Sequence, residues 1–93
     1  MGRWLHSGLR RDICVVVAAL DGGTDRAVKA ALERHYEDRI SPSQYQGAVD
    51  ALVRQGHLDR SVDGLQDRLA LTDAGEAALR DHAAWLEDAL GMG

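Results

Sequence analysis

The chain has 93 residues, a formal net charge of −4 at neutral pH and 45% hydrophobic residues. This composition predicts one small folded domain, whose core is marginal in size unless a second copy buries further apolar surface. The longest apolar run, residues 13–20, is too short to span a membrane, and a single cysteine, Cys14, excludes an internal disulfide. We expect a cytoplasmic protein, because the charges at residues 10–12 interrupt any signal-peptide pattern.

The charged residues are unusual in type and uneven in distribution. Ten of the 11 basic residues are Arg, 11 of the 15 acids are Asp, and Phe is absent. This composition resembles that of proteins from halophilic archaea. Residues 72–93 carry a net charge of −4, whereas residues 1–40 carry +1 and residues 41–71 carry −1. The middle of the chain is therefore close to neutral, and its local geometry decides whether it presents positive potential.

The first part of the chain predicts two helices. Apolar residues recur at helical spacing over residues 9–20, and Gly22-Gly23 follows as an ordinary helix breaker. A second helix is expected over about residues 25–37, with Thr24 as its N-cap. The buried side of this second helix is formed by three residues at helical spacing: Val28, Leu32 and Tyr36.

A third helix is marked at both ends by residues that delimit helices. Ser41 can cap its first turn, and Pro42 suits the first helical position. Gly56 stands where a residue with positive φ would end the helix, so we expect it over about residues 42–55. Its buried side is formed by four residues: Tyr45, Val49, Leu52 and Val53.

A hairpin and a last helix follow. Asp63-Gly64 is a turn signal between two short strands. Three leucines form the buried side of the hairpin: Leu58, Leu69 and Leu71. Thr72 begins a fourth helix of about residues 73–90, with Glu76 near the position that a capping box uses.

This order of elements is typical of a winged helix-turn-helix, which lays one helix in the DNA major groove and a hairpin beside it. The expected fold class is therefore mainly α with a small β-hairpin (α+β). We expect a single domain over residues 1–93, with a DNA-binding core at about 9–71 and a C-terminal dimerisation helix at about 72–90.

The chain resembles the PadR-like winged-helix transcriptional regulators over about residues 9–90. Five short elements carry this resemblance: Tyr45, Leu52, Gly56-His57-Leu58, Asp63-Gly64 and Leu71-Thr72-Asp73-Ala74-Gly75. The chain departs from the family pattern at Gln46, where the family often has Pro. It also departs in its hairpin, the wing of the fold, which is less basic than the wing usual in the family. The resemblance implies a homodimeric regulator of transcription that binds double-stranded DNA, has no enzymatic activity and dimerises through its C-terminal helix.

The polar face of the third helix holds the residues expected to read DNA. Gln can pair with adenine, and Ser can bond to bases or phosphates. Glycine within a helix costs about 1 kcal/mol relative to Ala, which is a reason to suspect a function for Gly47. The residues expected to contact DNA are Ser41, Ser43, Gln44, Gln46, Gly47, Arg54, Arg60, Arg68, Lys29 and Arg39. The alternatives are a solvated polar face and basic residues paired with local acids.

The fourth helix carries an apolar seam that predicts contact with a second copy. Its 4-3-4 spacing is that of a short coiled coil, with a large aromatic beside it. The residues expected at the dimer interface are Leu79, Ala83, Trp85, Leu86 and Leu90. The alternative is that this seam packs on the core of its own chain.

Two other functions remain open. Asp50 and the acidic residues of the wing favour a protein-interaction module that has lost DNA binding. A small-ligand or redox sensor would use the dimer cleft, although the apolar neighbours of Cys14 favour an inert core thiol. The four histidines lack metal-ligand spacing and no phosphate-binding loop is present, so we expect no metal, no cofactor and no catalysis.

Overall fold

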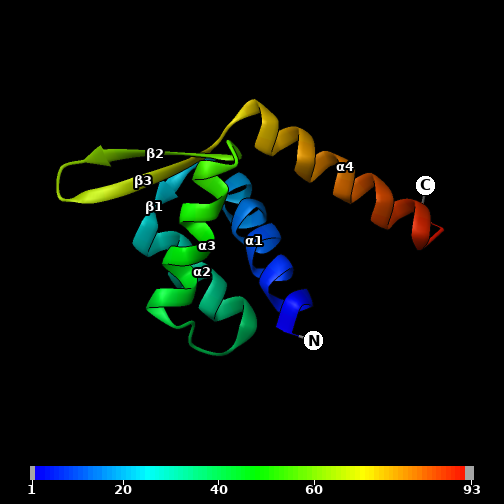
Figure 1. Cartoon of the computed structure of the whole chain (residues 1–93), viewed down its shortest axis with the longest axis horizontal. Coiled ribbons are helices and arrows are strands. Elements are labelled where there is room, and N and C mark those ends of the chain that lie inside the picture. Colours follow the sequence, from blue (N-terminus) through cyan, green and yellow to red (C-terminus); the bar gives the residue numbers. More distant parts are fainter. Residues whose placement is uncertain (1, 92–93) are drawn as a thin grey trace.

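The computed structural model describes residues 2–91 of the chain, and the side chains of all of these except residues 2–7 and 63. The elements follow in the order α1 (Gly2–Ala19), β1 (Gly23–Thr24), α2 (Asp25–Tyr36), α3 (Pro42–Arg54), β2 (Leu58–Asp63), β3 (Gln66–Leu71) and α4 (Asp73–Ala89). Helices α1, α2 and α3 form the body, the β2–β3 hairpin projects from one side, and α4 extends away on the other (Figure 1). In the described part of the chain, no helix has the length and apolar character needed to cross a membrane.

The three predicted N-caps are confirmed. The hydroxyl groups of Thr24, Ser41 and Thr72 each accept a hydrogen bond from the backbone N–H three residues later, at 3.1, 3.4 and 3.0 Å. Gly56, expected to end α3, has a φ of 80°. Local signals therefore place the starts of α2, α3 and α4 within a residue.

Two local predictions at helix ends are wrong. Helix α1 begins at Gly2 instead of residue 9, because residues 2–8 continue the same helix. No capping box forms at α4, since the Glu76 carboxylate accepts from Arg80 one turn later. The Thr72 N–H, which a capping box would satisfy, donates to the His57 carbonyl oxygen at 3.1 Å.

The sheet has three antiparallel strands in the order β1-β3-β2, so the predicted two-stranded hairpin was incomplete. The expected helix breaker at Gly23 is also the first residue of β1, where it pairs with Leu69 of β3. Asp63 pairs with Gln66, which makes Gly64 and Leu65 the two turn residues in place of Asp63-Gly64. The observed turn therefore lies one residue later in the chain than the predicted turn.

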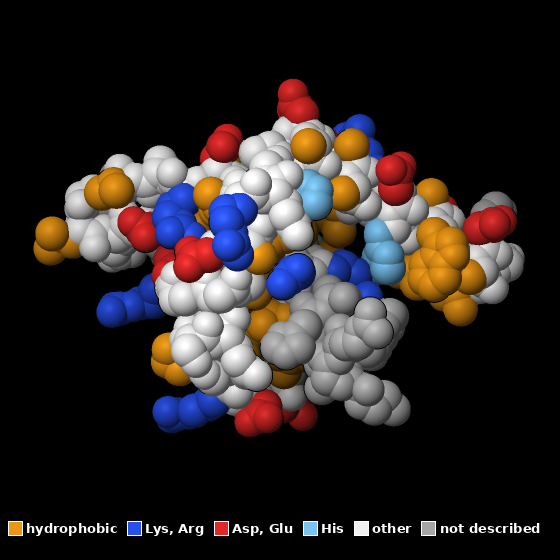
Figure 2. Space-filling model, in the orientation of Figure 1, with side chains coloured by type: hydrophobic (Ala, Val, Ile, Leu, Met, Phe, Trp, Pro, Cys, Tyr) orange, Lys and Arg blue, Asp and Glu red, His pale blue; other side chains and the backbone are white. Residues whose placement is uncertain are grey.

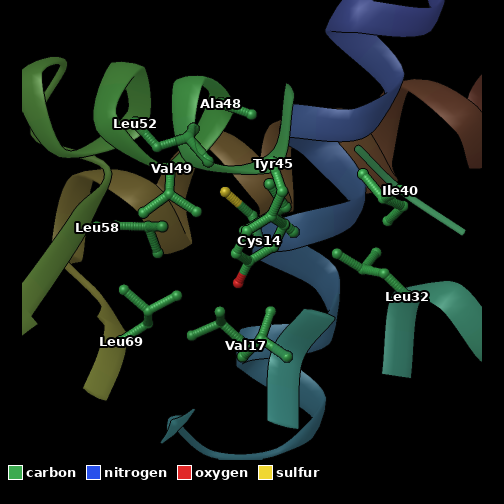
Figure 3. Close-up of a cluster of buried hydrophobic side chains, with 12 residues drawn as sticks. Cys14, Val17, Leu32, Ile40, Tyr45, Ala48, Val49, Leu52, Leu58 and Leu69 are labelled. Carbon is green, nitrogen blue, oxygen red and sulfur yellow. The ribbon is translucent and has the colours of Figure 1, made fainter. Parts of the chain in front are cut away.

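The hydrophobic core lies where α1, α2 and α3 meet the sheet, and Figure 3 shows its side chains pointing toward one another. Its members come from α1, α2, α3, β2, β3 and the loop before α3: Ile13, Cys14, Val17, Val28, Leu32, Ile40, Tyr45, Ala48, Val49, Leu52, Leu58 and Leu69. Tyr36 does not belong to it, contrary to expectation: it is exposed and its hydroxyl donates to the Asp12 carboxylate. Tyr36 is the last residue of α2, where the helix passes beyond the core.

The Thr-x-x-Gly motif joins α4 to the rest of the fold. Thr72 caps the helix and its hydroxyl also donates to the Gly56 carbonyl oxygen. A Cβ atom at Gly75 would lie 2.1 Å from the His57 carbonyl oxygen, so only glycine fits this close approach. The first turn of α4 is thus locked onto the connection between α3 and β2.

Candidate nucleic-acid interface

Helix α3 exposes the polar face predicted for it. Ser43, Gln44, Gln46, Gly47 and Arg54 are all exposed, whereas the opposite side of the helix is buried in the core. A Cβ atom at Gly47 would meet nothing within 4 Å, so no contact within the described protein requires glycine there.

Ser41 already has a role within the chain. Its hydroxyl accepts the capping hydrogen bond from the Gln44 N–H, and it lies 2.9 Å from the hydroxyl of Ser43. The two serines therefore form a hydroxyl pair at the start of α3, where the helix dipole and free N–H groups favour an anion such as a phosphate.

Gln46 is held by a residue that the sequence did not single out. Its Nε2 amide donates to Asp25 Oδ2 at 2.9 Å, across the gap between α3 and the start of α2. The neighbouring Tyr45 hydroxyl donates to the Asp25 backbone carbonyl at 3.1 Å. Burial, followed by the hydrogen bond and charge at Asp25, raises the pKa of Tyr45, so this hydroxyl stays a donor.

Arg60 of the wing is tied to the third helix. Its guanidinium forms an ion pair with Asp50 of α3, which bridges β2 and α3. The hydrogen bond to Asp50, together with the nearby charges of Asp50, Asp67 and Asp25, raises the pKa of Arg60. Part of its hydrogen-bonding capacity is therefore used within the protein.

The basic residues near α3 are interleaved with acids. Lys29 pairs with Glu33 one turn later at 3.4 Å, as the alternative interpretation of this residue predicted. Arg39 is exposed in the turn before α3, and Arg68 is exposed on β3. Figure 2 shows Lys and Arg side chains alternating with Asp and Glu side chains around the base of the hairpin. The described side chains on this face form no continuous positive strip.

Two exposed apolar side chains lie at the tip of the hairpin, which the sequence pattern did not predict. Val62 is 76% exposed and Leu65 is fully exposed in the turn. Figure 2 shows hydrophobic side chains at the outer end of the hairpin. Leu65 could have been identified as a turn residue only if the turn had been placed one residue later.

Helix α4 separates the predicted dimer residues into two groups. Leu79 is half-buried and packs against the core of its own chain. Ala83, Trp85, Leu86 and Leu90 lie beyond that contact and are exposed, with Trp85 at 59% and Leu90 at 69%. Figure 2 shows hydrophobic surface on the part of α4 that extends from the body. The apolar strip on α4 (residues 83, 85, 86 and 90) thus has no cover within the described chain.

A cavity of about 380 Å³ lies where α4 leaves the body. Its lining includes Arg10, Arg11, Cys14, His57, Leu79 and His82. Burial raises the pKa of the Cys14 thiol, which keeps it protonated and unreactive at neutral pH. The described residues contain no group of three or more His, Cys, Asp or Glu that could hold a metal ion.

Comparison with solved structures places this geometry in a known fold. RosR from H. salinarum matches with a TM-score of 0.81 and 25% identity, over 86% of this chain and 73% of RosR. TA0346 from Thermoplasma acidophilum, described as a proposed transcriptional regulator, matches with a TM-score of 0.77 and 17% identity. The match covers 97% of this chain and 89% of TA0346. A winged-helix DNA-binding protein from STIV matches with a TM-score of 0.71 and 14% identity, over 84% and 85%.

The chain has a winged-helix fold. The predicted fold class, mainly α with a small sheet, is thereby confirmed. No protein-family model matches the chain, and no curated protein matches it. The narrower PadR-like assignment therefore stays a prediction.

Proposed function

We propose that the protein is a sequence-specific regulator of transcription that binds double-stranded DNA as a homodimer and has no enzymatic activity. The observation that carries this proposal is α3, a capped helix with an exposed polar face beside an exposed hairpin. In a winged-helix fold this helix enters the major groove, and the hairpin lies along the adjacent backbone. Its structural neighbours include a protein described as winged-helix and DNA-binding.

The proposed reading residues are Gln44 and Gln46, and the proposed phosphate contacts are basic or hydroxyl side chains around them. Glutamine amides can discriminate bases, whereas Arg, Lys and Ser contacts to phosphates position the protein. The proposed phosphate contacts are Ser41, Ser43, Arg54, Arg60, Arg68, Lys29 and Arg39. Gly47 lets the groove edge approach the helix closely.

The test is selection of bound sequences from random oligonucleotides, followed by titrations at high potassium chloride. High salt is used because it screens the repulsion among the Asp-rich surface charges. The double variant Gln44→Ala, Gln46→Ala should lose the preference for a selected site over a scrambled one, by about 1–3 kcal/mol per good contact. If the selection enriches no sequence, the proposal is wrong. An unchanged ratio in the double variant would exclude the two glutamines as base readers.

A second candidate function is a protein-interaction module. It is favoured by the Asp50–Arg60 ion pair, which ties a wing cation to α3 and leaves the interface with mixed charge. Such a module would bind no DNA at any salt concentration. A ligand or redox sensor is the remaining alternative. The raised pKa of the Cys14 thiol argues against the redox form, which would be identified by a change in DNA affinity on oxidation that a Cys14→Ala variant lacks.

A further inference from the structure

The Asp25–Gln46 hydrogen bond determines which end of the Gln46 amide faces outward. An ionised carboxylate only accepts hydrogen bonds, so the group that faces Asp25 must be the amide nitrogen. The carbonyl oxygen, Oε1, is on the other branch of the amide and points away from Asp25. Gln46 is thus presented from α3 with its acceptor directed away from the protein contact.

The surroundings of Asp25 keep this arrangement in place. The Tyr45 hydroxyl holds the Asp25 backbone, and Tyr45 itself is only 1% exposed. The other carboxylate oxygen, Asp25 Oδ1, is buried and has no hydrogen-bond partner among the described residues. Release of Gln46 would therefore leave the carboxylate without its side-chain donor, which is unfavourable for a charged group.

The major groove offers two kinds of partner to such an amide. Adenine and cytosine present amino groups, which donate hydrogen bonds, whereas guanine and thymine present keto oxygens, which accept them. An outward Oε1 accepts from an amino group, whereas a keto oxygen placed opposite it would face a second acceptor. Asp25 occupies one of the two N–H donors of the amide, so only one is left to donate elsewhere. A free glutamine could instead rotate and donate its NH2 group to the keto oxygen.

We propose, on the basis of the DNA-binding function above, that Asp25 is a specificity-determining residue. It makes Gln46 select an amino base, adenine or cytosine, over a keto base, guanine or thymine, at one position of the operator. Asp25 acts as a positioning residue: it touches the reading side chain and not the DNA.

The test uses two matched variants. Asp25→Asn keeps the shape of the side chain but offers both a donor and an acceptor, so Gln46 can adopt either orientation. Asp73→Asn is the control, because Asp73 follows the N-cap Thr72 just as Asp25 follows the N-cap Thr24. The control removes the same charge from the same helix position, in a helix that does not contact Gln46.

The binding site is first selected from random oligonucleotides with the wild-type protein at high potassium chloride. The position that faces Gln46 is the one whose base preference disappears in Gln46→Ala. Affinities are then measured for all four bases at this position. The wild type and Asp73→Asn should favour adenine or cytosine by about fivefold to hundredfold, the range of one specific contact. Asp25→Asn should lose most of this preference, because its affinity for the keto variants should rise.

A measurement without DNA checks the hydrogen bond itself. The side-chain amide signals of Gln46 in an NMR spectrum should shift in Asp25→Asn and stay unchanged in Asp73→Asn.

The outcomes separate this inference from the proposed function. Retention of the amino-base preference by Asp25→Asn, or a keto-base preference in the wild type, would overturn the inference while DNA binding stands. If Gln46→Ala changes the base preference at no position of the site, the inference is overturned as well. Failure of the selection to enrich any sequence would overturn the proposed function and this inference together.

Discussion

Gly75 and Gly47 both lie inside helices, yet the structure gives them opposite roles. Gly75 is buried against the His57 carbonyl, where a side chain has no room. Gly47 is exposed, and added atoms there would meet only open space. The first glycine is explained by the fold, whereas the second is not, which is why we assign Gly47 to the proposed DNA contact.

The two glycines yield a paired prediction. Gly75→Ala should destabilise the protein by about 1–3 kcal/mol, because α4 must shift to accommodate the methyl group. Gly47→Ala should stabilise it by up to about 1 kcal/mol through helix propensity, and at the same time weaken DNA binding. Thermal unfolding and DNA titration of both variants check this. A Gly47→Ala protein that binds DNA as well as the wild type would show that this glycine serves no close approach.

At the scale of elements, the features that could be predicted from the sequence were those set by neighbouring residues. The caps at Thr24, Ser41 and Thr72 act over three residues, and all three were found where expected. Strand β1 was missed because Gly23-Thr24 becomes a strand only by pairing with β3, more than 40 residues later. A two-residue strand carries no period of its own that could be recognised.

In the candidate site, too, the features set by local sequence were predictable and the long-range contacts were not. The exposure of Gln44, Gln46 and Gly47 followed from helical periodicity, because the buried side of α3 was already identified. The partners of these side chains did not follow, since Asp25 and Gln46 are 21 residues apart and Asp50 and Arg60 are ten apart. Such contacts depend on how α2, α3 and the hairpin pack, which no local pattern encodes.

The wing gives a prediction at the scale of an element. Arg68 is exposed on β3, and its replacement by Ala should weaken binding to all DNA sequences about equally. The slope of log affinity against log salt should flatten by about one unit, because one phosphate contact is lost. Arg80→Ala is the matched control, since Arg80 pairs with Glu76 on α4, outside the proposed interface. Equal slopes for Arg68→Ala and the wild type would exclude the wing residue from phosphate contact.

At the scale of the whole molecule, α4 is the helix that packs least against the rest of its own chain. Its one buried residue is Gly75 in the first turn, and Leu79 is the last residue that packs on the core. A short isolated helix is marginal in water, so the ten residues beyond Leu79 need another surface to remain helical. The exposed apolar strip there, together with the small core, favours a second copy as that surface.

The dimer is tested by placing charge in this strip. Leu86 and Leu90 are 40% and 69% exposed, and burial against a symmetric copy would stabilise by up to about 1.5–3 kcal/mol for each side chain. The variant Leu86→Asp, Leu90→Asp should therefore sediment as a monomer in high salt and lose DNA binding together with dimerisation, because paired half-sites need two reading helices.

Leu65→Asp is the control for this variant, since it makes the same kind of substitution at an exposed leucine on the hairpin, away from α4. It should leave the protein dimeric. High salt is needed for both proteins, because it screens the five acids of residues 72–93, which would otherwise repel their counterparts across the interface. A wild-type protein that sediments as a monomer at a concentration of tens of micromolar would contradict the dimer, and the proposal of paired half-sites would have to be abandoned with it.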